Sequence, residues 1–214
     1  MSKPETIVIL AAGEFPRSES VLQLLDEADM IACCDSAAET LAASGRVPDL
    51  IVGDLDSISA EIKQRYADKI VVCSGQDDND LTKTFHEVLG LHPSVIHILG
   101  ATGRREDHTL GNISLLADYQ KEAPRCQLDM VSDWGRFVAA SGQRTFVSEP
   151  GQEVSIFAFD HSLRMTAAGL QYPLDGVIFD SLWKATLNTA TGSSFTLTPS
   201  SDSPYLVYLC NPGM

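Results

Sequence analysis

Basic residues are scarce in this sequence of 214 residues, which has 15 lysines and arginines against 29 aspartates and glutamates. The formal net charge of −14 means that the protein as a whole repels polyanions. Nucleic acid and anionic membrane surfaces are therefore not expected as partners, because both bind basic surfaces. An anionic small molecule would need metal ions or a local basic group to be held.

Long apolar runs are also missing. No run approaches the roughly 18 residues that a membrane-spanning helix needs, and residues 1–5 have no signal-peptide pattern. The five cysteines form no CxxC pair, which disfavours a zinc site, and their odd number disfavours a disulphide framework. We therefore expect a cytoplasmic protein with reduced cysteines and no membrane partner.

Three common site motifs are absent as well. The sequence contains no GxSxG, no GxGxxG, and no GxxxxGK followed by serine or threonine. These absences disfavour a covalent serine hydrolase, a dinucleotide-binding fold and a phosphate-loop NTPase.

Apolar runs alternate with helical patterns in the first part of the chain. The continuous run Ile7–Ala12 is typical of a buried strand, and Ser18 offers an N-cap to the helical stripe that follows it. Leu81–Leu89 has apolar residues at the spacing of a helix, which Gly90 ends. This alternation predicts an α/β domain over residues 1–134, with a mostly parallel sheet covered by helices.

The pattern changes after about residue 137. Short segments rich in Val, Phe, Tyr and Thr follow one another, at Glu153–Phe159, Ser194–Thr198 and Tyr205–Cys210. Turn residues such as Glu149-Pro150-Gly151 separate them. This pattern predicts a smaller antiparallel β sandwich or barrel domain over residues 135–214.

Aspartates follow the ends of four apolar runs in the first domain. They are Asp35, Asp54, Asp56, Asp77, Asp80 and Asp107. Ligands of an open α/β sheet bind beyond the carboxyl ends of its strands, so these side chains are expected at one rim. Clustered carboxylates repel one another and are normally held together by a cation. The pattern predicts a Mg²⁺ site that handles a phosphorylated substrate.

Two short segments carry most of these aspartates. Asp54-Leu55-Asp56 is expected to be extended, which directs both carboxylates to one metal ion. The alternative is a solvated turn in which Asp56 caps a helix over Ser57–Arg65. The second segment is Gln76–Lys83. Within it, Asp80 is expected to be the N-cap of a helix, and Lys83, one turn inside that helix, could neutralise a phosphate.

The third segment, Gly100–Asn112, is the most specific. Its glycines allow backbone N–H groups to turn toward an anion, and Asp107 stands at a helix start. Arg104 and Arg105 are the only paired basic residues in the chain and are expected to clamp phosphates. The role of His108 stays open between a helix cap or core residue and a catalytic group.

These three segments resemble motifs of the thiamine pyrophosphokinase family. The motifs are Pro-Asp-Leu-Ile-x-Gly-Asp-x-Asp-Ser at Pro48–Ser57, Gln-Asp-x-Thr/Asn-Asp-x-x-Lys at Gln76–Lys83, and Gly-Ala-x-Gly-Gly-Arg-x-Asp-His-x-x-x-Asn at Gly100–Asn112. With Gly169–Leu174 in the second domain, the resemblance covers nearly the whole chain. Three motifs in order at matching spacing are far more specific than any one of them.

The resemblance implies an enzyme that transfers a diphosphoryl group from ATP to the hydroxyl of thiamine, giving thiamine diphosphate and AMP. Mg²⁺ would be the cofactor. The first domain would bind ATP and magnesium and carry catalysis, and the second would contribute to thiamine binding and dimerisation. The partner implied is a second copy of the chain, in a homodimer with shared active sites.

The resemblance also implies the roles of individual residues. Catalysis would use Asp54, Asp56, Asp77, Asp80 and Asp107, of which the first four would bind the metal. ATP would contact Asp35, Lys83, Gly100, Thr102, Gly103, Arg104, Arg105 and His108. Thiamine would contact Leu187, Asn188 and Thr189.

The sequence departs from the family pattern at three places. Asp35-Ser36-Ala37-Ala38-Glu39 replaces Asp-Gly-Gly-Ala-Asn, Arg104 replaces the second glycine of the third motif, and Leu187 replaces a serine. Other interpretations stay open: a related pyrophosphokinase acting on another alcohol such as a pterin, or a catalytically inactive thiamine- or nucleotide-binding protein. A haloacid-dehalogenase-type phosphatase would use Asp54 as nucleophile, but Ile58 stands where its motif has threonine.

Overall fold

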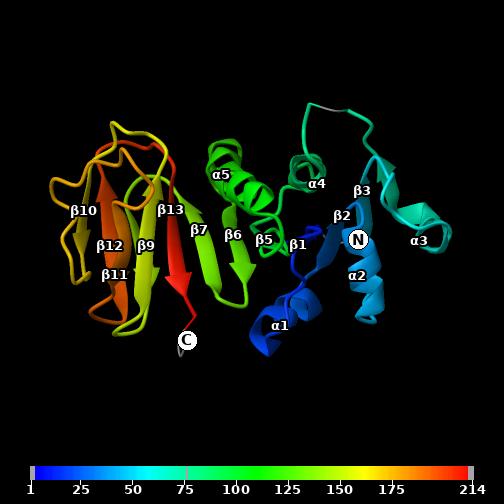
Figure 1. The fold of residues 1–214 in the computed structure, drawn as a ribbon, viewed down its shortest axis with the longest axis horizontal. Coiled ribbons are helices and arrows are strands. Elements are labelled where there is room, and N and C mark those ends of the chain that lie inside the picture. The colour runs from blue at the N-terminus through cyan, green and yellow to red at the C-terminus, as the bar shows by residue number, and fades with distance from the viewer. Residues whose placement is uncertain (1–2, 76, 212–214) are drawn as a thin grey trace. The chain divides into compact units, whose positions relative to one another are not determined.

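Six parallel strands form the sheet of the first part of the chain, in the order β6-β5-β1-β2-β3-β4 (Figure 1). The strands are β1 (Thr6–Leu10), β2 (Met30–Cys34), β3 (Leu50–Gly53), β4 (Ile70–Val72), β5 (Val95–Leu99) and β6 (Gln127–Ser132). The structure is a computed structural model that describes residues 3–75 and 77–211. The parallel sheet expected from the sequence is confirmed.

The chain divides into two units. The first unit contains Met1–Leu115 and Arg125–Asp133, and the second contains Leu116–Pro124 and Trp134–Met214. The last turns of helix α5 (Glu106–Glu122) are thereby grouped with the second unit.

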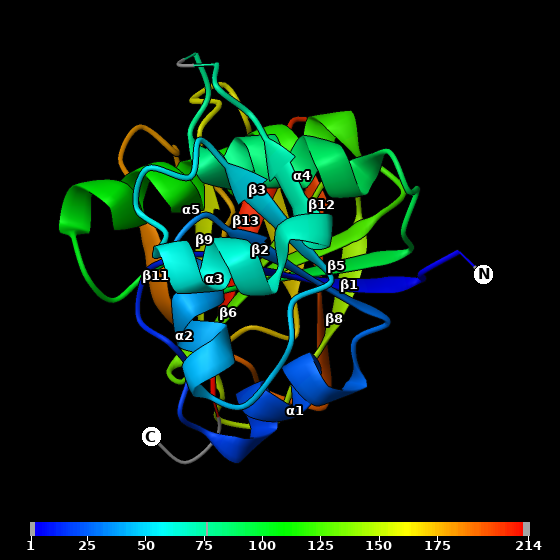
Figure 2. The same cartoon turned by 90° about the vertical axis from the view of Figure 1, so that its right-hand side faces the viewer.

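Helices cover both faces of the parallel sheet. Besides α5 they are α1 (Glu19–Glu27), α2 (Ala37–Ala43), α3 (Ala60–Arg65) and α4 (Asp80–Leu89), with a short 3-10 helix at Ala67–Lys69. Helices α1, α2 and α3 share a buried core with sheet residues such as Val8 and Ile51. Helix α4 packs on β1, β2 and β3, and Figure 2 shows it on the other side of the strands from α1 and α2. Successive residues Ile7, Val8 and Ile9 are fully buried, as expected for a strand covered on both faces.

Helix α3 starts later than the sequence indicated. Its N-cap is Ser59, whose side chain accepts a hydrogen bond from the Ile62 N–H at 3.3 Å. The interpretation of Asp56 as a helix cap is therefore wrong, because the chain makes a further turn between Asp56 and the helix.

Helix α4 also has a different cap. Asn79 Oδ1 accepts the Thr82 N–H at 2.8 Å, and Asp80 is the first residue of the helix. The prediction of Asp80 as N-cap is wrong by one residue. Since Asn79 satisfies the backbone donor, the Asp80 carboxylate is left for other contacts.

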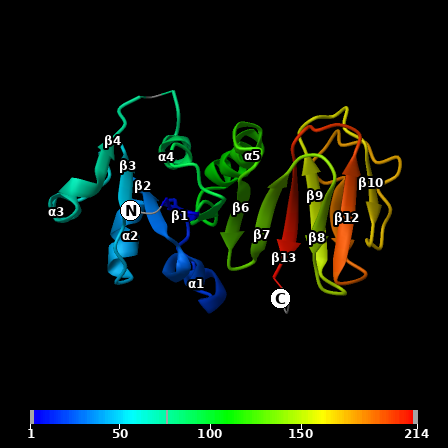
Figure 3. The same cartoon turned by 180° about the vertical axis from the view of Figure 1, so that it is seen from behind.

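The second unit is built from two antiparallel sheets, with strand orders β11-β9-β13-β7 and β10-β12-β8 (Figure 3). The strands are β7 (Gly135–Ala140), β8 (Arg144–Val147), β9 (Glu153–Ala158), β10 (Met165–Ala168), β11 (Ala185–Thr189), β12 (Ser194–Pro199) and β13 (Tyr205–Cys210). Their buried side chains form one core, in which Phe146 and Phe195 stack with ring centroids 5.2 Å apart. The smaller antiparallel domain expected from the sequence is confirmed as a sandwich.

Candidate active site

Three carboxylates meet at the carboxyl ends of two neighbouring strands. Asp35 directly follows β2, and Asp54 and Asp56 follow β3. One oxygen from each of the three lies within 4.8 Å of the others. The expected gathering of aspartates at the strand ends is thus visible for these three, and Asp35 belongs to the carboxylate cluster as well as to the cavity described below.

The backbone brings these side chains together by turns. Leu55 has a φ of 67° and Asp35 a φ of 42°, both in the left-handed region that residues with a Cβ rarely adopt. The Asp56 N–H donates to Asp54 Oδ1 at 3.2 Å across the Leu55 turn. The expectation of an extended Asp54–Asp56 segment is wrong, because the carboxylates converge through this turn and not through strand alternation.

Gly53 makes room for the cluster. A Cβ at this position would lie 2.9 Å from the Asp35 Cβ, closer than side-chain carbons approach in folded proteins. A residue without a side chain is therefore required where β3 ends beside Asp35.

Asp35 is the buried member of the cluster, with 5% of its surface exposed. Burial raises the pKa of its carboxyl above the ordinary value, against the opposing effect of the Ser36 N–H. The nearby carboxylates of Asp80, Asp54 and Asp56 raise it further. Among the described residues, its Oδ1 is buried and has no hydrogen-bond partner. A buried oxygen without a donor is costly, and a bound cation would remove that cost.

Asp80 and Lys83 form an ion pair on α4, with Lys83 Nζ 3.2 Å from Asp80 Oδ1. The lysine side chain is only 10% exposed, so its charge is held close to this carboxylate. Asp77 is exposed in the preceding turn, and Gln76, the first residue of the second motif, lies outside the described residues. The structure therefore brings Asp80 and Lys83 together and leaves Asp77 apart from the carboxylate cluster.

The loops after β1 and β5 are joined by backbone hydrogen bonds. The Gly13 N–H donates to the Gly100 carbonyl at 2.6 Å, and the Glu14 N–H donates to the Thr102 carbonyl at 2.8 Å. A Cβ on Gly13 would lie 2.3 Å from the Gly100 oxygen, so only glycine fits there. Asn112 supports the second loop, since its Nδ2 donates to the Ala101 carbonyl at 2.8 Å.

The two arginines of this loop have different partners. Arg105 forms a two-bond fork with Asp107, at 3.1 Å from Nε to Oδ1 and 2.6 Å from Nη2 to Oδ2. The Arg105 side chain is the main reason that the pKa of Asp107 falls to about 2, and the His108 N–H lowers it further. Arg104 instead donates from Nη1 to the Ala12 carbonyl at 3.0 Å.

These loops and strand ends surround a cavity of about 570 Å³ in the first unit. Of the predicted site residues, those in its lining are Asp35, Asp80, Thr102, Arg104, Arg105, Asp107 and His108. The predicted ATP contacts Gly100, Gly103 and Lys83 are not among the described lining residues, and neither are Asp54 and Asp56, although Ser57 is. Ala11–Gly13 also line the cavity and were not predicted, although the apolar run that ends at Gly13 was an available signal. Asn112, the last residue of the third motif, lines the cavity too, although no contact was predicted for it.

The altered segment after β2 has a structural role of its own. Glu39, on α2, accepts a hydrogen bond from the Ser59 N–H at 2.7 Å. Ser59 is the cap of α3 and ends the loop that carries Asp54 and Asp56. Glu39 thus ties that loop to α2.

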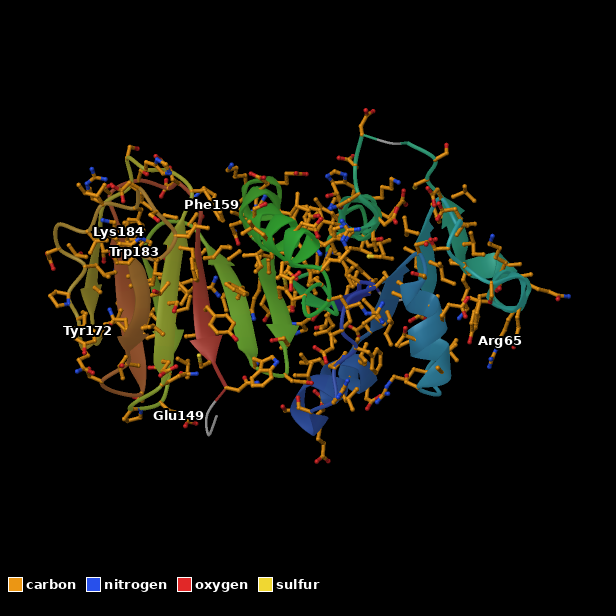
Figure 4. The ribbon with its side chains drawn as sticks, viewed as in Figure 1. Arg65, Glu149, Phe159, Tyr172, Trp183 and Lys184 are labelled. Carbon is orange, nitrogen blue, oxygen red and sulfur yellow. The ribbon has the colours of Figure 1, made fainter. Side chains whose placement is uncertain are left out.

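The predicted thiamine segment lies on β11 in the second unit. Asn188 is buried, and its side-chain amide accepts from the Tyr172 N–H at 3.0 Å and donates to the Tyr172 carbonyl at 2.8 Å. Leu187 is 72% exposed and has a φ of 57°. Figure 4 shows Tyr172 and Trp183 at the surface of the same unit, where they are 56% and 68% exposed.

Carboxylates, arginines and a helix start surround a cavity beyond the ends of parallel strands, an arrangement suited to binding phosphate in an α/β protein. Comparison with known families is more specific. The "Thiamin pyrophosphokinase, catalytic domain" family matches residues 21–128, and the "Thiamin pyrophosphokinase, substrate-binding domain" family matches residues 135–208. The chain belongs to the thiamine pyrophosphokinase family, and the resemblance found from its motifs is confirmed.

Individual relatives agree with this assignment. Thiamine pyrophosphokinase of Bacillus subtilis is 27% identical over 176 residues, which are 80% of this chain and 82% of the relative. Thiamine pyrophosphokinase 1 of Oryza sativa is 38% identical over 79 residues, which are 32% of this chain and 30% of the relative.

Solved structures share the fold. A crystal structure of thiamine pyrophosphokinase from Bacillus subtilis has a TM-score of 0.81 and 23% identity, covering 97% of this chain and 99% of that one. Thiamin pyrophosphokinase from Candida albicans also has a TM-score of 0.81, with 19% identity, and the alignment covers 96% of this chain and 89% of that one. Among the described residues, no helix has the length and apolar character needed to cross a bilayer.

Proposed function

We propose that this chain transfers a diphosphoryl group from ATP to the hydroxyl of thiamine, giving thiamine diphosphate and AMP. The family assignment supports this reaction. The observation that carries the proposal most directly is a carboxylate cluster whose member Asp35 lines the same cavity as two arginines. Carboxylates suit a divalent cation, and arginines suit phosphate oxygens.

The cluster fits magnesium. Asp35, Asp54 and Asp56 have oxygens close enough to share one ion, and Oδ1 of Asp35, which has no hydrogen-bond partner among the described residues, is an acceptor that a cation would satisfy. Asp77 and Asp80 remain our proposed further ligands. When bound, magnesium would offset the charge of the phosphates and of the developing transition state.

The remaining steps depend on positioning. Arg105 and Arg104 would hold phosphate oxygens at the start of α5, with Lys83 offsetting further charge. Asp107 would orient the thiamine hydroxyl toward the β-phosphorus, and AMP would leave. Phosphoryl transfer needs little covalent chemistry from the protein, so orientation and charge neutralisation account for catalysis.

We propose that residues 1–134 form the ATP- and magnesium-binding catalytic domain and that residues 135–214 contribute to thiamine binding and dimerisation. Leu187, Asn188 and Thr189 would form the thiamine segment. Because Asn188 is committed to Tyr172, Leu187 and the backbone would make the direct contacts, and Asn188 would hold the segment in place. The working form would be a cytoplasmic homodimer with shared active sites.

Hybrid dimers test the shared site. An Asp54→Asn chain lacks the metal site, and a Leu187→Lys chain places a positive charge where a cationic thiamine would bind. A mixed dimer would carry one site with both lesions and one with neither, so mixing the inactive variants should restore part of the activity. If the variants exchange subunits and activity stays absent, each site belongs to one chain.

The reaction is tested by incubating the protein with ATP, magnesium and thiamine and then separating the nucleotides. AMP and thiamine diphosphate in equal amounts are expected, and removal of magnesium with a chelator should abolish both. ADP and free phosphate would contradict the proposal. Binding of thiamine without turnover would instead indicate an inactive binding protein.

A further inference from the structure

Arg104 connects the two loops that line the cavity. It lies in the loop after β5, and its Nη1 reaches the Ala12 carbonyl of the loop after β1 at 3.0 Å. An arginine has five N–H donors in a planar fork, and this contact uses one of them. Among the described residues, Arg104 has no second hydrogen-bond partner, and its side chain borders the cavity.

The positive charges of the candidate site are not equivalent. Arg105 is matched by the Asp107 carboxylate through two bonds, and Lys83 is matched by Asp80 at 3.2 Å. The partner of Arg104 is a neutral carbonyl, and no carboxylate within residues 3–75 and 77–211 forms an ion pair with it. Its full charge is therefore available to a ligand.

From this difference we propose that the charge of Arg104 sets the affinity of the cavity for the phosphates of the nucleotide. The inference rests on the proposed ATP site. The Nε–Nη2 edge of Arg105 is engaged by Asp107, whose carboxylate also offsets the charge of this arginine, whereas among the described residues no ion pair offsets the charge of Arg104. The family pattern described above has glycine at this position, so the Arg104 side chain departs from that pattern.

The anchor to Ala12 gives the contact its geometry. A guanidinium held at one edge by a carbonyl presents its other edge in a fixed direction, which lowers the entropy lost when a phosphate binds. Charge and anchoring can be separated by substitution. Arg104→Gln retains a donor for the Ala12 carbonyl and removes the charge, whereas Arg104→Lys retains the charge and removes the planar fork.

The test is titration calorimetry of the full-length protein with MgATP. We expect Arg104→Gln to weaken binding about tenfold or more, and Arg104→Lys to recover part of that loss. The dependence of the binding constant on salt should also become shallower in Arg104→Gln, because one charge contact with phosphate is gone. A purely structural role for Arg104 would not change that slope.

Arg17→Gln is the matched control. Arg17 lies in the loop between β1 and α1, pairs with Glu14 at 3.4 Å and is outside the cavity lining. The Arg17→Gln substitution removes the same charge, and we expect the affinity of this variant for MgATP to stay within about twofold of that of the unaltered chain. Thermal unfolding of each variant checks the fold, and Arg104→Gly provides a second neutral variant with the residue of the family pattern.

Equal MgATP affinity in the unaltered chain, Arg104→Gln and Arg104→Gly would overturn the inference. An equal loss of MgATP affinity in Arg17→Gln would also overturn it, because the loss would then follow from the change in net charge alone. Failure of the proposed function looks different. If the unaltered chain binds MgATP but forms no AMP with thiamine, the reaction is refuted while the binding comparison still decides the role of Arg104.

Discussion

In the first unit, one oxygen from each of Asp35, Asp54 and Asp56 lies within 4.8 Å of the others, and among the described residues no basic side chain pairs with these three. In the second unit, the polar side chain of the predicted thiamine segment is Asn188, which is buried and hydrogen-bonded to the backbone of Tyr172. Carboxylates that repel one another are suited to binding a cation, whereas polar groups that are hydrogen-bonded within the protein stabilise the fold.

The same contrast appears in the backbone. Asp35, Leu55 and Leu187 all have positive φ values. Around Asp35 and Leu55 the unusual backbone positions carboxylates, but at Leu187 it turns an apolar side chain toward solvent. Strained positions in both units are therefore candidate binding sites, with charge chemistry in the first and apolar contact in the second.

The largest effect should follow from removing charge in the first unit. Asp54→Asn or Asp56→Asn should lower the rate of AMP formation by at least about two powers of ten, because stabilising charge at a phosphate site is worth several kcal/mol. Folding should persist, since carboxylate repulsion is relieved. Steady-state kinetics and thermal unfolding check both statements, and near-normal turnover in Asp54→Asn with intact magnesium dependence would refute the metal site.

A smaller effect is expected at the arginine fork. Arg105→Ala should raise the KM for ATP about tenfold, because a charge-assisted phosphate contact is lost, and should change the KM for thiamine much less. Initial rates at varied concentrations of each substrate measure the two constants. A larger change in the KM for thiamine than in the KM for ATP would indicate that Arg105 contacts thiamine and not the nucleotide.

In the second unit the expected effect is on stability. Asn188→Ala removes the amide that pairs with the Tyr172 N–H and carbonyl, so the free energy of unfolding should fall by about 1–3 kcal/mol. Leu187→Ala is the neighbouring control, and because Leu187 is exposed its effect should stay within about 0.5 kcal/mol. Denaturant titration measures both. If both variants unfold with the same free energy, the hydrogen bonds of Asn188 do not stabilise the fold, and the contrast drawn with the first unit is wrong.

The smallest effects concern single carboxyl groups. The pKa values of Asp107 and Asp160 both fall to about 2, Asp107 mainly through Arg105 and Asp160 mainly through the Ser162 hydroxyl. A lowered pKa stabilises the fold above about pH 4, and that contribution is lost as the pH falls toward about 2. Carboxyl NMR titration should show that Arg105→Ala raises the pKa of Asp107 and leaves that of Asp160 unchanged. Equal shifts in both would point to a change in net charge alone.

The sequence was sufficient for the fold and for the location of the acidic cluster. Continuous apolar runs such as Ile7–Ala12 predicted buried parallel strands, and the aspartates after them predicted the rim. Local conformation was harder to predict, because the left-handed turn at Leu55 contains no glycine or asparagine that would signal it. Asn79 and Asp80 are equally good caps, so their order could not be decided from residue type.

Contacts between residues far apart in the chain could not be predicted from the sequence. Ala11–Gly13 carries no charged side chain, and its place in the cavity depends on hydrogen bonds to the loop after β5. The commitment of Asn188 to Tyr172 joins residues 16 positions apart and could not be inferred from either segment alone. Such contacts arise from packing and not from local preference.

The most direct measurement follows the terminal phosphate of ATP. With a radiolabelled γ-phosphate, magnesium and thiamine, attack at the β-phosphorus carries both the β- and γ-phosphates to the product. We predict that the label appears in thiamine diphosphate, with one AMP formed for each labelled product. Label in free phosphate with ADP, or in a thiamine monophosphate, would contradict it.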